Sequence, residues 1–236
     1  MRDVTLSKEI ELRGYANRDS LGYREGYRIP EVKTLLRGTL RYPGFGKVIG
    51  AAKTMGLLSQ QKFDSQPANW SQLISLLSGI ETAALASDLP MEDSVKESFA
   101  WLGCFSDEVV EGDSPISAFC NLLCAKLQYA DDEQDMIVMQ HRMVLVDKQG
   151  QKTFHRSTLI EKGDLGGFSA MAKTVGYPAA IAADLILQGK IERKGVCIPV
   201  TKDIYEPVLN ELEKLNIRME DKIIKDQSET SFLNEL

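Results

Sequence analysis

Apolar positions recur along the chain with two different periods, and each period belongs to particular segments. Residues 1–13 alternate loosely between apolar and polar side chains, which predicts a strand or an extended entry segment. Residues 32–41 alternate again and are predicted to be a strand. Residues 14–30 are rich in Gly, Asn, Asp, Ser and Tyr and are interpreted mainly as loop. Residues 43–56 carry apolar side chains at helical spacing between a proline and a glycine, which predicts a helix with an ordinary start and end.

The middle of the chain is helical in pattern, and the part after it has the pattern of strands. Helices are predicted within 70–77, 95–102 and 116–127. Residues 136–146 form a long apolar-rich strand, and 151–161 returns as a second strand after a short turn. The two strands predict a β-hairpin.

The register of this hairpin decides where the two histidines of the chain lie. If Val146 pairs with Gln151, His141 lies opposite Arg156, and His155 points to the other face because strand side chains alternate. The two histidines could not share a metal in that register. Both are interpreted as structural or surface residues, and no metal site is predicted.

Further helical stretches begin near residues 168, 178 and 207. The patterns together predict an α/β (α+β) fold, in which helices pack on a mixed β-sheet and an all-helical subdomain is inserted. The α/β domain is discontinuous and takes 1–58 and 134–220. The insertion takes 59–133, and 221–236 is a polar tail that is expected to fray.

Charge is distributed unevenly between these regions. The net charge is −6, which argues against a broad nucleic-acid surface. The first 56 residues carry eleven Lys and Arg against six Asp and Glu, whereas 60–133 carries three against thirteen. No apolar run approaches the roughly 20 residues that span a bilayer, and the N-terminus has no signal-peptide pattern. No membrane partner is predicted, and a cytoplasmic protein is expected.

The pattern of the four cysteines is consistent with the expected cytoplasmic location. Cys104, Cys120, Cys124 and Cys197 contain no Cys-x-x-Cys pair, and they lack the ligand spacing of a structural zinc site. They are interpreted as reduced thiols.

A polar face with two arginines is predicted on the strand over 32–41. Strand alternation places Arg37, Thr39 and Arg41 on one face, and helical spacing would still align the two arginines. The planar guanidinium group binds carboxylates through two parallel hydrogen bonds. This face therefore suits a small substrate with several carboxylates. The alternative is an ordinary exposed strand face with surface ion pairs.

The loop upstream adds a second group of polar residues: Asn17, Arg18, Asp19 and Ser20. Together with the strand they form an arginine-rich polar face. The alternative is a self-contained loop, in which Asp19 pairs with Arg18 and Asn17 caps a turn.

Ser169 follows two glycines at a predicted helix start, and Lys173 lies one turn further on the same face. Ser169 and nearby backbone N–H groups could bind an anion, and Lys173 could bind a carboxylate or transfer a proton. The alternatives are an N-cap serine and a solvated lysine. No Gly-x-Gly-x-x-Gly follows a predicted strand, so no dinucleotide site is predicted in this chain.

Beyond these patterns, the sequence resembles the substrate domain of glutamate-forming saccharopine dehydrogenase (saccharopine reductase) from about residue 11 to about residue 217. The segments that carry the resemblance are Asn17-Arg18-Asp19-Ser20, Leu36-Arg37-Gly38-Thr39-Leu40-Arg41-Tyr42, Trp101-Leu102-Gly103, Asp135-Met136-Ile137-Val138-Met139, Ser169-Ala170-Met171-Ala172-Lys173-Thr174-Val175-Gly176, Pro178-Ala179-Ala180 and the region from Gly195 to Pro207.

The resemblance implies a protein of three parts: a Rossmann domain that binds NAD(P), an α/β substrate and dimerisation domain, and a helical domain inserted within it. This chain looks like the second and third parts. The implied reaction is the reversible oxidative cleavage of saccharopine to glutamate and 2-aminoadipate 6-semialdehyde, in lysine metabolism. The implied partners are saccharopine, a second copy of the chain paired through the sheet, and a Rossmann domain in cis or in trans.

The resemblance also suggests roles for single residues. Arg18, Arg37 and Arg41 are expected to bind the carboxylates of saccharopine. The residues expected to add hydrogen bonds are Asn17, Ser20, Thr39 and Ser169. Asp19 and Lys173 are the acid/base candidates. Two other functions stay open: a binding and dimerisation module without catalysis, and a related reductase that acts on another amino-acid-derived imine.

Overall fold

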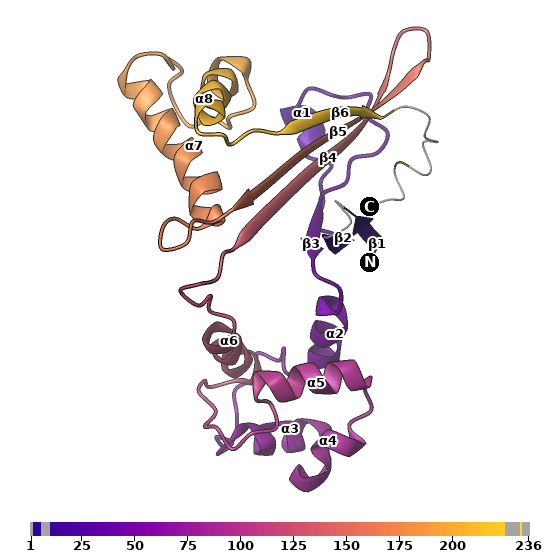
Figure 1. Ribbon diagram of the computed structural model, residues 1–236. Coiled ribbons are helices and arrows are strands. Elements are labelled where there is room, and N and C mark those ends of the chain that lie inside the picture. The colour runs from indigo at the N-terminus through magenta and orange to yellow at the C-terminus, as the bar shows by residue number, and fades with distance from the viewer. Residues whose placement is uncertain (1, 6–9, 225–231, 233–236) are drawn as a thin grey trace. The chain divides into compact units, whose positions relative to one another are not determined.

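The computed structural model of the chain describes residues 2–5, 10–224 and 232. The chain forms two compact units. One unit runs from Arg41 to Gln128 and is helical, and the other contains Arg2–Leu40 and Tyr129–Leu236 and holds the strands (Figure 1). The predicted mixed α/β class is therefore correct, with helices in both units.

The helical unit has well-defined helix ends. Its elements are α2 (Phe45–Met55), α3 (Trp70–Ser78), η1 (Thr82–Ala84), α4 (Leu85–Asp88), α5 (Asp93–Leu102) and α6 (Pro115–Lys126). The Asn69 side chain accepts a hydrogen bond from the first turn of α3, and Ser114 does the same for α6. Gly56 ends α2 in the left-handed conformation, as its position predicted.

The core of the helical unit shows why its boundary lies earlier in the chain than the predicted residue 59. Ala52 of α2 is fully buried, and it belongs to the same core cluster as Trp70, Phe99 and Phe119. Because α2 buries its apolar face against these helices, it is part of the helical unit and not of the α/β domain.

The N-terminal segment forms a small sheet and one helical turn. Its elements are β1 (Arg2–Thr5), β2 (Glu11–Ala16), α1 (Tyr23–Gly26) and β3 (Gly38–Arg41), in strand order β1-β2-β3. The prediction that 14–30 is mainly loop is confirmed, with the end of β2 and the short α1 within it. The predicted strand over 32–41 was wrong in its extent, because it is a strand only from Gly38. The backbone of Arg37 instead bonds to the loop at 17–20, as described below. Residues 6–9 of the first predicted strand lie outside the described residues.

The second sheet is antiparallel and has the strand order β4-β5-β6. Its strands are β4 (Met136–Val146), β5 (Lys152–Lys162) and β6 (Glu220–Ile224). The predicted polar tail begins too early, because residues 221–224 belong to β6, which pairs with β5. Phe232 is buried, and its ring is tilted against that of Phe154 with the ring centres 5.3 Å apart. The rest of the predicted tail beyond β6 lies outside the described residues.

The hairpin register differs by one residue from the prediction. Val146 pairs with Lys152, so His141 lies opposite Ser157, and His155 lies opposite Met143. The shift arises because Gln151 closes the turn: its carbonyl accepts a hydrogen bond from the backbone N–H of Asp147. Both histidines therefore lie on the same face of the sheet, which corrects the prediction of opposite faces. No group of three metal-binding side chains occurs within the described residues.

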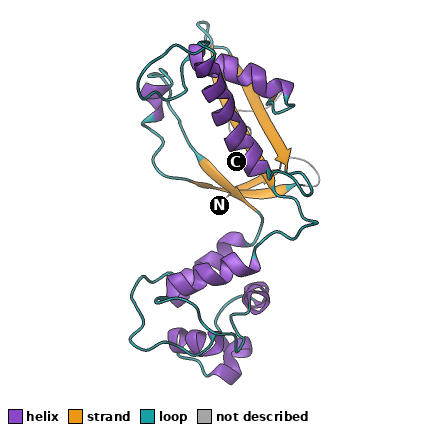
Figure 2. Ribbon diagram, turned by 90° about the vertical axis from the view of Figure 1, so that its left-hand side faces the viewer, coloured by secondary structure: helices purple, strands orange, loops and turns teal. Residues whose placement is uncertain are grey.

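Helices α7 (Ala170–Leu187) and α8 (Lys202–Lys214) lie over one face of this sheet (Figures 1 and 2). Their contact with the sheet centres on Leu159, Leu212 and Ile217, which are buried together. Helix α7 is continuous through Pro178, where a second helix was predicted to begin. Proline removes one backbone hydrogen bond from a helix. Helix α7 nevertheless continues through Pro178, and it packs on α8 and the sheet. By length and composition alone α7 could span a membrane, although it packs on α8 and the sheet.

An ion pair closes the loop between α7 and α8. The Arg193 guanidinium donates from Nε to Asp203 at 2.9 Å and from Nη2 at 3.2 Å. This hydrogen-bonded pair lowers the pKa of Asp203 from its ordinary value to about 2. A carboxylate with a lowered pKa stabilises the fold above its ordinary pKa and loses that effect as pH falls through the lowered value.

The Asp203→Asn variant is therefore expected to show a weaker fall of melting temperature than the parent chain between about pH 4 and pH 2. The effect is expected to be small because both side chains are about half exposed. Circular dichroism melting across this pH range measures it. Equal slopes for the two proteins would contradict the assignment.

Candidate functional site

Two backbone hydrogen bonds join the segments that carry the predicted arginines. The N–H of Asn17 donates to the carbonyl of Arg37 at 2.9 Å, and the N–H of Arg37 donates to the Ser20 hydroxyl at 3.2 Å. Ser20 is almost fully buried, with 5% of its surface exposed. The loop at 17–20 and the segment before β3 are thus held side by side, although about 17 residues separate them.

The Arg37 side chain lies on an aromatic residue of α1. Its Nη1 donates to the Tyr23 hydroxyl at 2.5 Å, and its guanidinium carbon lies 5.2 Å from the centre of the Tyr23 ring. Tyr23 in turn stacks on Tyr27 at 5.5 Å. Such a contact limits the rotamers of a long side chain. The sequence pattern does not single out Tyr23, whose only signal is the tyrosine-rich composition of the loop.

Arg18 has an unusual backbone conformation. Its φ of 52° lies in the left-handed region, which a residue with a long side chain rarely adopts. Conformations of this kind are concentrated at functional sites. The neighbouring Asp19 accepts a hydrogen bond from the N–H of Leu21 at 2.9 Å. The carboxylate of this acid/base candidate thereby shapes the loop.

The other two predicted residues of the arginine face lie on β3. Thr39 is half-buried. The Arg41 guanidinium lies 5.4 Å from the ring centre of Phe45, and the two compact units divide just before Arg41. The structure therefore brings together the segments of Arg18 and Arg37, whereas Arg41 is described with the helical unit.

The start of α7 is built around a carboxylate of the chain itself. The Ser169 hydroxyl caps the helix by accepting a hydrogen bond from the N–H of Ala172 at 3.0 Å. Asp135 accepts hydrogen bonds from the N–H groups of Ala170 and Met171 at 2.6 and 3.0 Å. The amides that were considered as an anion site thus already hold an anion, which favours the N-cap interpretation of Ser169.

Lys173 lies next to this cap in a cluster of charges. Its Nζ lies 2.5 Å from Glu161 and 3.0 Å from Asp164, and only 11% of its side chain is exposed. The hydrogen bond to Glu161, followed by that to Asp164, raises the pKa of Lys173 above its ordinary value. A lysine that acts as a base near neutral pH needs a lowered pKa, so the geometry favours a structural role for Lys173.

Replacing Lys173 with methionine is expected to lower the melting temperature at neutral pH, because Glu161 and Asp164 would lose the cation that they share. A raised pKa gives stability that is complete below the ordinary lysine pKa and is lost as pH rises through the raised value. The deficit of the variant should therefore shrink in strong alkali. Lys162→Met, on the exposed end of β5, is the control. A variant as stable as the parent at neutral pH would contradict the assignment.

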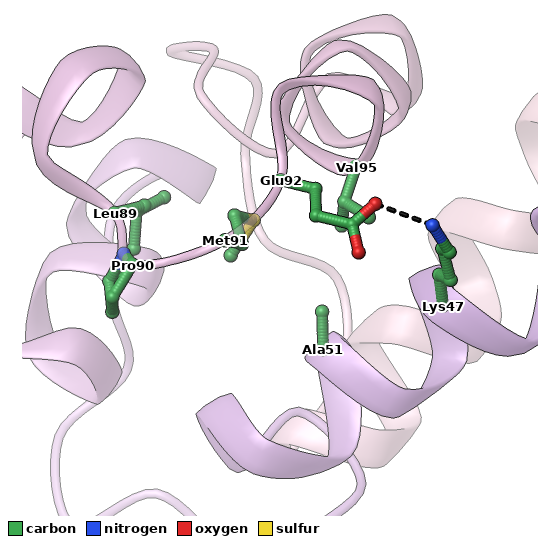
Figure 3. A pocket seen from close by; sticks show the side chains of 7 residues that line it. All are labelled: Lys47, Ala51, Leu89, Pro90, Met91, Glu92 and Val95. Carbon is green, nitrogen blue, oxygen red and sulfur yellow. Dashed lines mark hydrogen bonds and ion pairs between the residues drawn. The ribbon is translucent and has the colours of Figure 1, made fainter.

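A separate open pocket of about 650 Å³ lies in the helical unit (Figure 3). Apolar side chains line most of it, and Lys47 meets Glu92 at 2.6 Å at one side. Its lining residues are Lys47, Ala51, Leu89, Pro90, Met91, Glu92 and Val95. No residue of the predicted site is among them.

The fold is of the mixed α/β class, with a helical unit that lies in the sequence between the two segments of the strand-containing unit. The chain belongs to the saccharopine dehydrogenase C-terminal domain family, whose model matches residues 1–217.

Relatives of known activity agree with this family. The chain is 35% identical over 229 residues to saccharopine dehydrogenase [NADP(+), L-glutamate-forming] of Saccharomyces cerevisiae, covering 89% of this chain and 51% of the relative. It is 38% identical over 218 residues to mitochondrial alpha-aminoadipic semialdehyde synthase of Mus musculus, covering 86% of this chain and 24% of that relative. The chain thus spans about half of the fungal relative and a quarter of the mammalian one.

A solved structure confirms the fold. The chain is similar to apo histidine-tagged saccharopine dehydrogenase (L-Glu forming) from Saccharomyces cerevisiae, with a TM-score of 0.87 and 33% identity. The match covers 94% of this chain and 54% of that one.

The described residues do not fit a nicotinamide dinucleotide. The glycine-rich turn before α7 is the nearest counterpart of a phosphate-binding loop, but its helix amides hold Asp135. Gly163 leaves room for this carboxylate, because a Cβ atom there would lie 2.2 Å from Asp135 Oδ1. The turn therefore serves an internal cap and not a pyrophosphate.

Proposed function

We propose that this chain is the substrate-binding portion of an NADP-dependent, L-glutamate-forming saccharopine dehydrogenase of lysine metabolism. The proposed reaction of the whole protein converts saccharopine, NADP⁺ and water to glutamate, 2-aminoadipate 6-semialdehyde, NADPH and a proton. The observation that carries the proposal is the pairing of the loop at 17–20 with Arg37, because it holds two arginine-bearing segments together.

In this proposal Arg18 and Arg37 bind carboxylates of saccharopine, which has three. Charge-assisted, bidentate hydrogen bonds make arginine suited to this task. Ser20 contributes indirectly, because its hydroxyl accepts a hydrogen bond from the backbone N–H of Arg37 and so positions that residue. Thr39 follows on β3 and is proposed to bind the remainder of the ligand.

The cofactor is proposed to bind to a Rossmann domain that lies outside the residues that the structure describes. The names of the fungal relatives support NADP⁺, and the occupied amides of α7 support a site elsewhere. When bound, NADP⁺ would accept the hydride from the carbon beside the secondary amine of saccharopine. The residues of this chain would hold the carboxylates so that this carbon is oriented.

A homodimer through the β4-β5-β6 sheet is also proposed. Met139, Met143 and Leu145 lie on one face of β4, and Ile223 of β6 lies on the same face. All four are 44–62% exposed, and exposed apolar side chains on one face of a sheet are typical of an interaction site. Met143→Glu should reduce the mass measured by light scattering from two chains to one, whereas exposed Leu127→Glu should not. Equal masses for the two variants would contradict this interface.

A second candidate is a binding and dimerisation module without catalysis. It is favoured by the poor fit of the described residues to a dinucleotide. Titration of NADPH into the chain discriminates, because specific binding would contradict both this candidate and the proposed location of the cofactor site.

The experiment that tests the proposed function is a thermal melt with and without saccharopine. A ligand that binds only the folded chain raises its melting temperature. An increase with saccharopine, and a smaller one with lysine, which has a single carboxylate, is the expected result. The absence of any increase at millimolar saccharopine would contradict substrate binding by this chain.

A further inference from the structure

Two cysteine thiols lie one helical turn apart on the outer side of α6. Cys120 and Cys124 are both free and both exposed. Positions four residues apart share one face of an α-helix. The other side of α6 is held in the core of the helical unit, where Phe119 and Leu122 are buried, and Ser114 caps its first turn. The helix is therefore a fixed support for the two thiols, which we name the α6 dithiol.

Exposure of both members distinguishes the α6 dithiol from the other cysteines. Free cysteine is among the residue types most often buried in proteins. Cys104 follows this rule, because it is fully buried and burial raises the pKa of its thiol to about 12. Such a thiol is inert near neutral pH, since the thiolate is the reactive form. Cys197 is exposed but belongs to the strand-containing unit.

The spacing of the α6 dithiol is too wide for an internal disulfide and suits a bridging ion. The Cβ atoms of residues four apart on a helix are about 5–6 Å apart, whereas a disulfide needs about 3.5–4.5 Å. Two sulfurs on one metal ion, each bound at about 2.3 Å as in zinc thiolates, lie up to about 4.6 Å apart. Rotation about the Cα–Cβ bond of each cysteine can bring the sulfurs within this range without moving the helix.

The chemistry of the pair selects the ligand. Cysteine sulfur prefers soft metal centres. Within the ranges 2–5 and 10–224, no three His, Cys, Asp or Glu side chains are grouped to hold a metal, so a centre that is satisfied by two sulfurs fits best. We propose that the α6 dithiol is a binding site for a soft, thiol-seeking metal or metalloid that takes two sulfurs from this chain. The site is additional to the proposed saccharopine site and does not depend on it.

Phenylarsine oxide is the probe that tests this site. In water its trivalent arsenic carries two hydroxyl groups. Each thiol forms an As–S bond, and its proton leaves with one hydroxyl as water, so arsenic stays trivalent and no oxidant is needed. The reduced 236-residue chain should gain one phenylarsenic group in intact-protein mass spectrometry. It should keep this group in excess 2-mercaptoethanol, because two linked sulfurs bind about a hundredfold or more tighter than one, and dithiothreitol should remove it.

Serine variants assign the retained group to its thiols. Cys120→Ser and Cys124→Ser should each lose the group in 2-mercaptoethanol, whereas Cys197→Ser should keep it. Both serines replace exposed thiols and are expected to leave the fold intact, which tryptophan fluorescence of the helical unit checks. Cys124→Ser combined with Ala125→Cys is the placement control, because it keeps two thiols on α6 but turns one to a neighbouring face, and it should not retain the group.

Four results would overturn the proposal. The first is a parent chain that retains no phenylarsenic group in 2-mercaptoethanol. The second is retention by Cys120→Ser or Cys124→Ser, because one sulfur would then suffice. The third is loss of the group from Cys197→Ser, which would assign the arsenic to another pair of thiols. The fourth is full retention by the placement control, because the shared face of α6 would then be irrelevant.

Discussion

Replacing Phe99 with alanine is expected to lower the free energy of unfolding of the helical unit by about 3–5 kcal/mol, the usual cost of emptying a buried aromatic position. Phe99 is fully buried at the centre of the core cluster and lies 6.4 Å from the ring of Phe105. Alanine would leave a cavity between helices that also hold Trp70 and Phe119. Because a small unit has few other stabilising contacts, a loss of this size is a large part of its stability.

Tryptophan fluorescence in urea measures this effect in the helical unit alone, because both tryptophans of the chain lie within it. Trp70 is buried and should report unfolding, whereas Trp101 is 65% exposed and should report little. Trp101→Ala on the same helix is the matched control and is expected to change stability far less. A loss for Phe99→Ala no larger than that of the control would show that the core is not packed as described.

Replacing Arg37 with alanine is expected to remove most of the melting-temperature increase that saccharopine gives. Loss of a charged hydrogen-bonding partner corresponds to about tenfold to a hundredfold weaker binding. The alanine variant should fold normally, because Arg37 is exposed and its backbone bonds to Asn17 and Ser20 are kept. Melts over a series of saccharopine concentrations yield the affinity.

Lys33→Ala is the matched control for Arg37→Ala. Lys33 is exposed and lies four residues before Arg37, and its replacement with alanine removes the same charge. Arg37→Lys separates charge from geometry, because lysine keeps the charge but lacks the planar fork. If Lys33→Ala weakened saccharopine as much as Arg37→Ala, the effect would be one of net charge and not of a specific contact.

The helices of the core were predictable because their pattern is local. Residues 95–102 carry apolar side chains at helical spacing, and α5 covers that segment. The hairpin of β4 and β5 was predictable for the same reason. Its register was not, because Asp147 organises a turn that includes Gln151 through side-chain and backbone hydrogen bonds. A shift of one residue moved Arg142 opposite Arg156 and brought the histidines to one face.

The candidate site was predictable only in part. The sequence drew attention to Arg18 and Arg37 through residue chemistry, but not to Tyr23, because one turn of helix leaves no periodic signal. The cap of α7 was missed because Asp135 lies 35 residues before the helix amides that it binds. Contacts between distant segments depend on the folded chain, and spacing in one sequence does not reveal them.

The two arginine-bearing segments joined by Ser20 are proposed to form one site for an acidic ligand. A crystal structure of the chain with saccharopine tests it most directly. The account predicts carboxylate oxygens within about 3 Å of the guanidinium nitrogens of both Arg18 and Arg37. Saccharopine bound elsewhere, with Arg37 still hydrogen-bonded to Tyr23 and no carboxylate near Arg18, would contradict it.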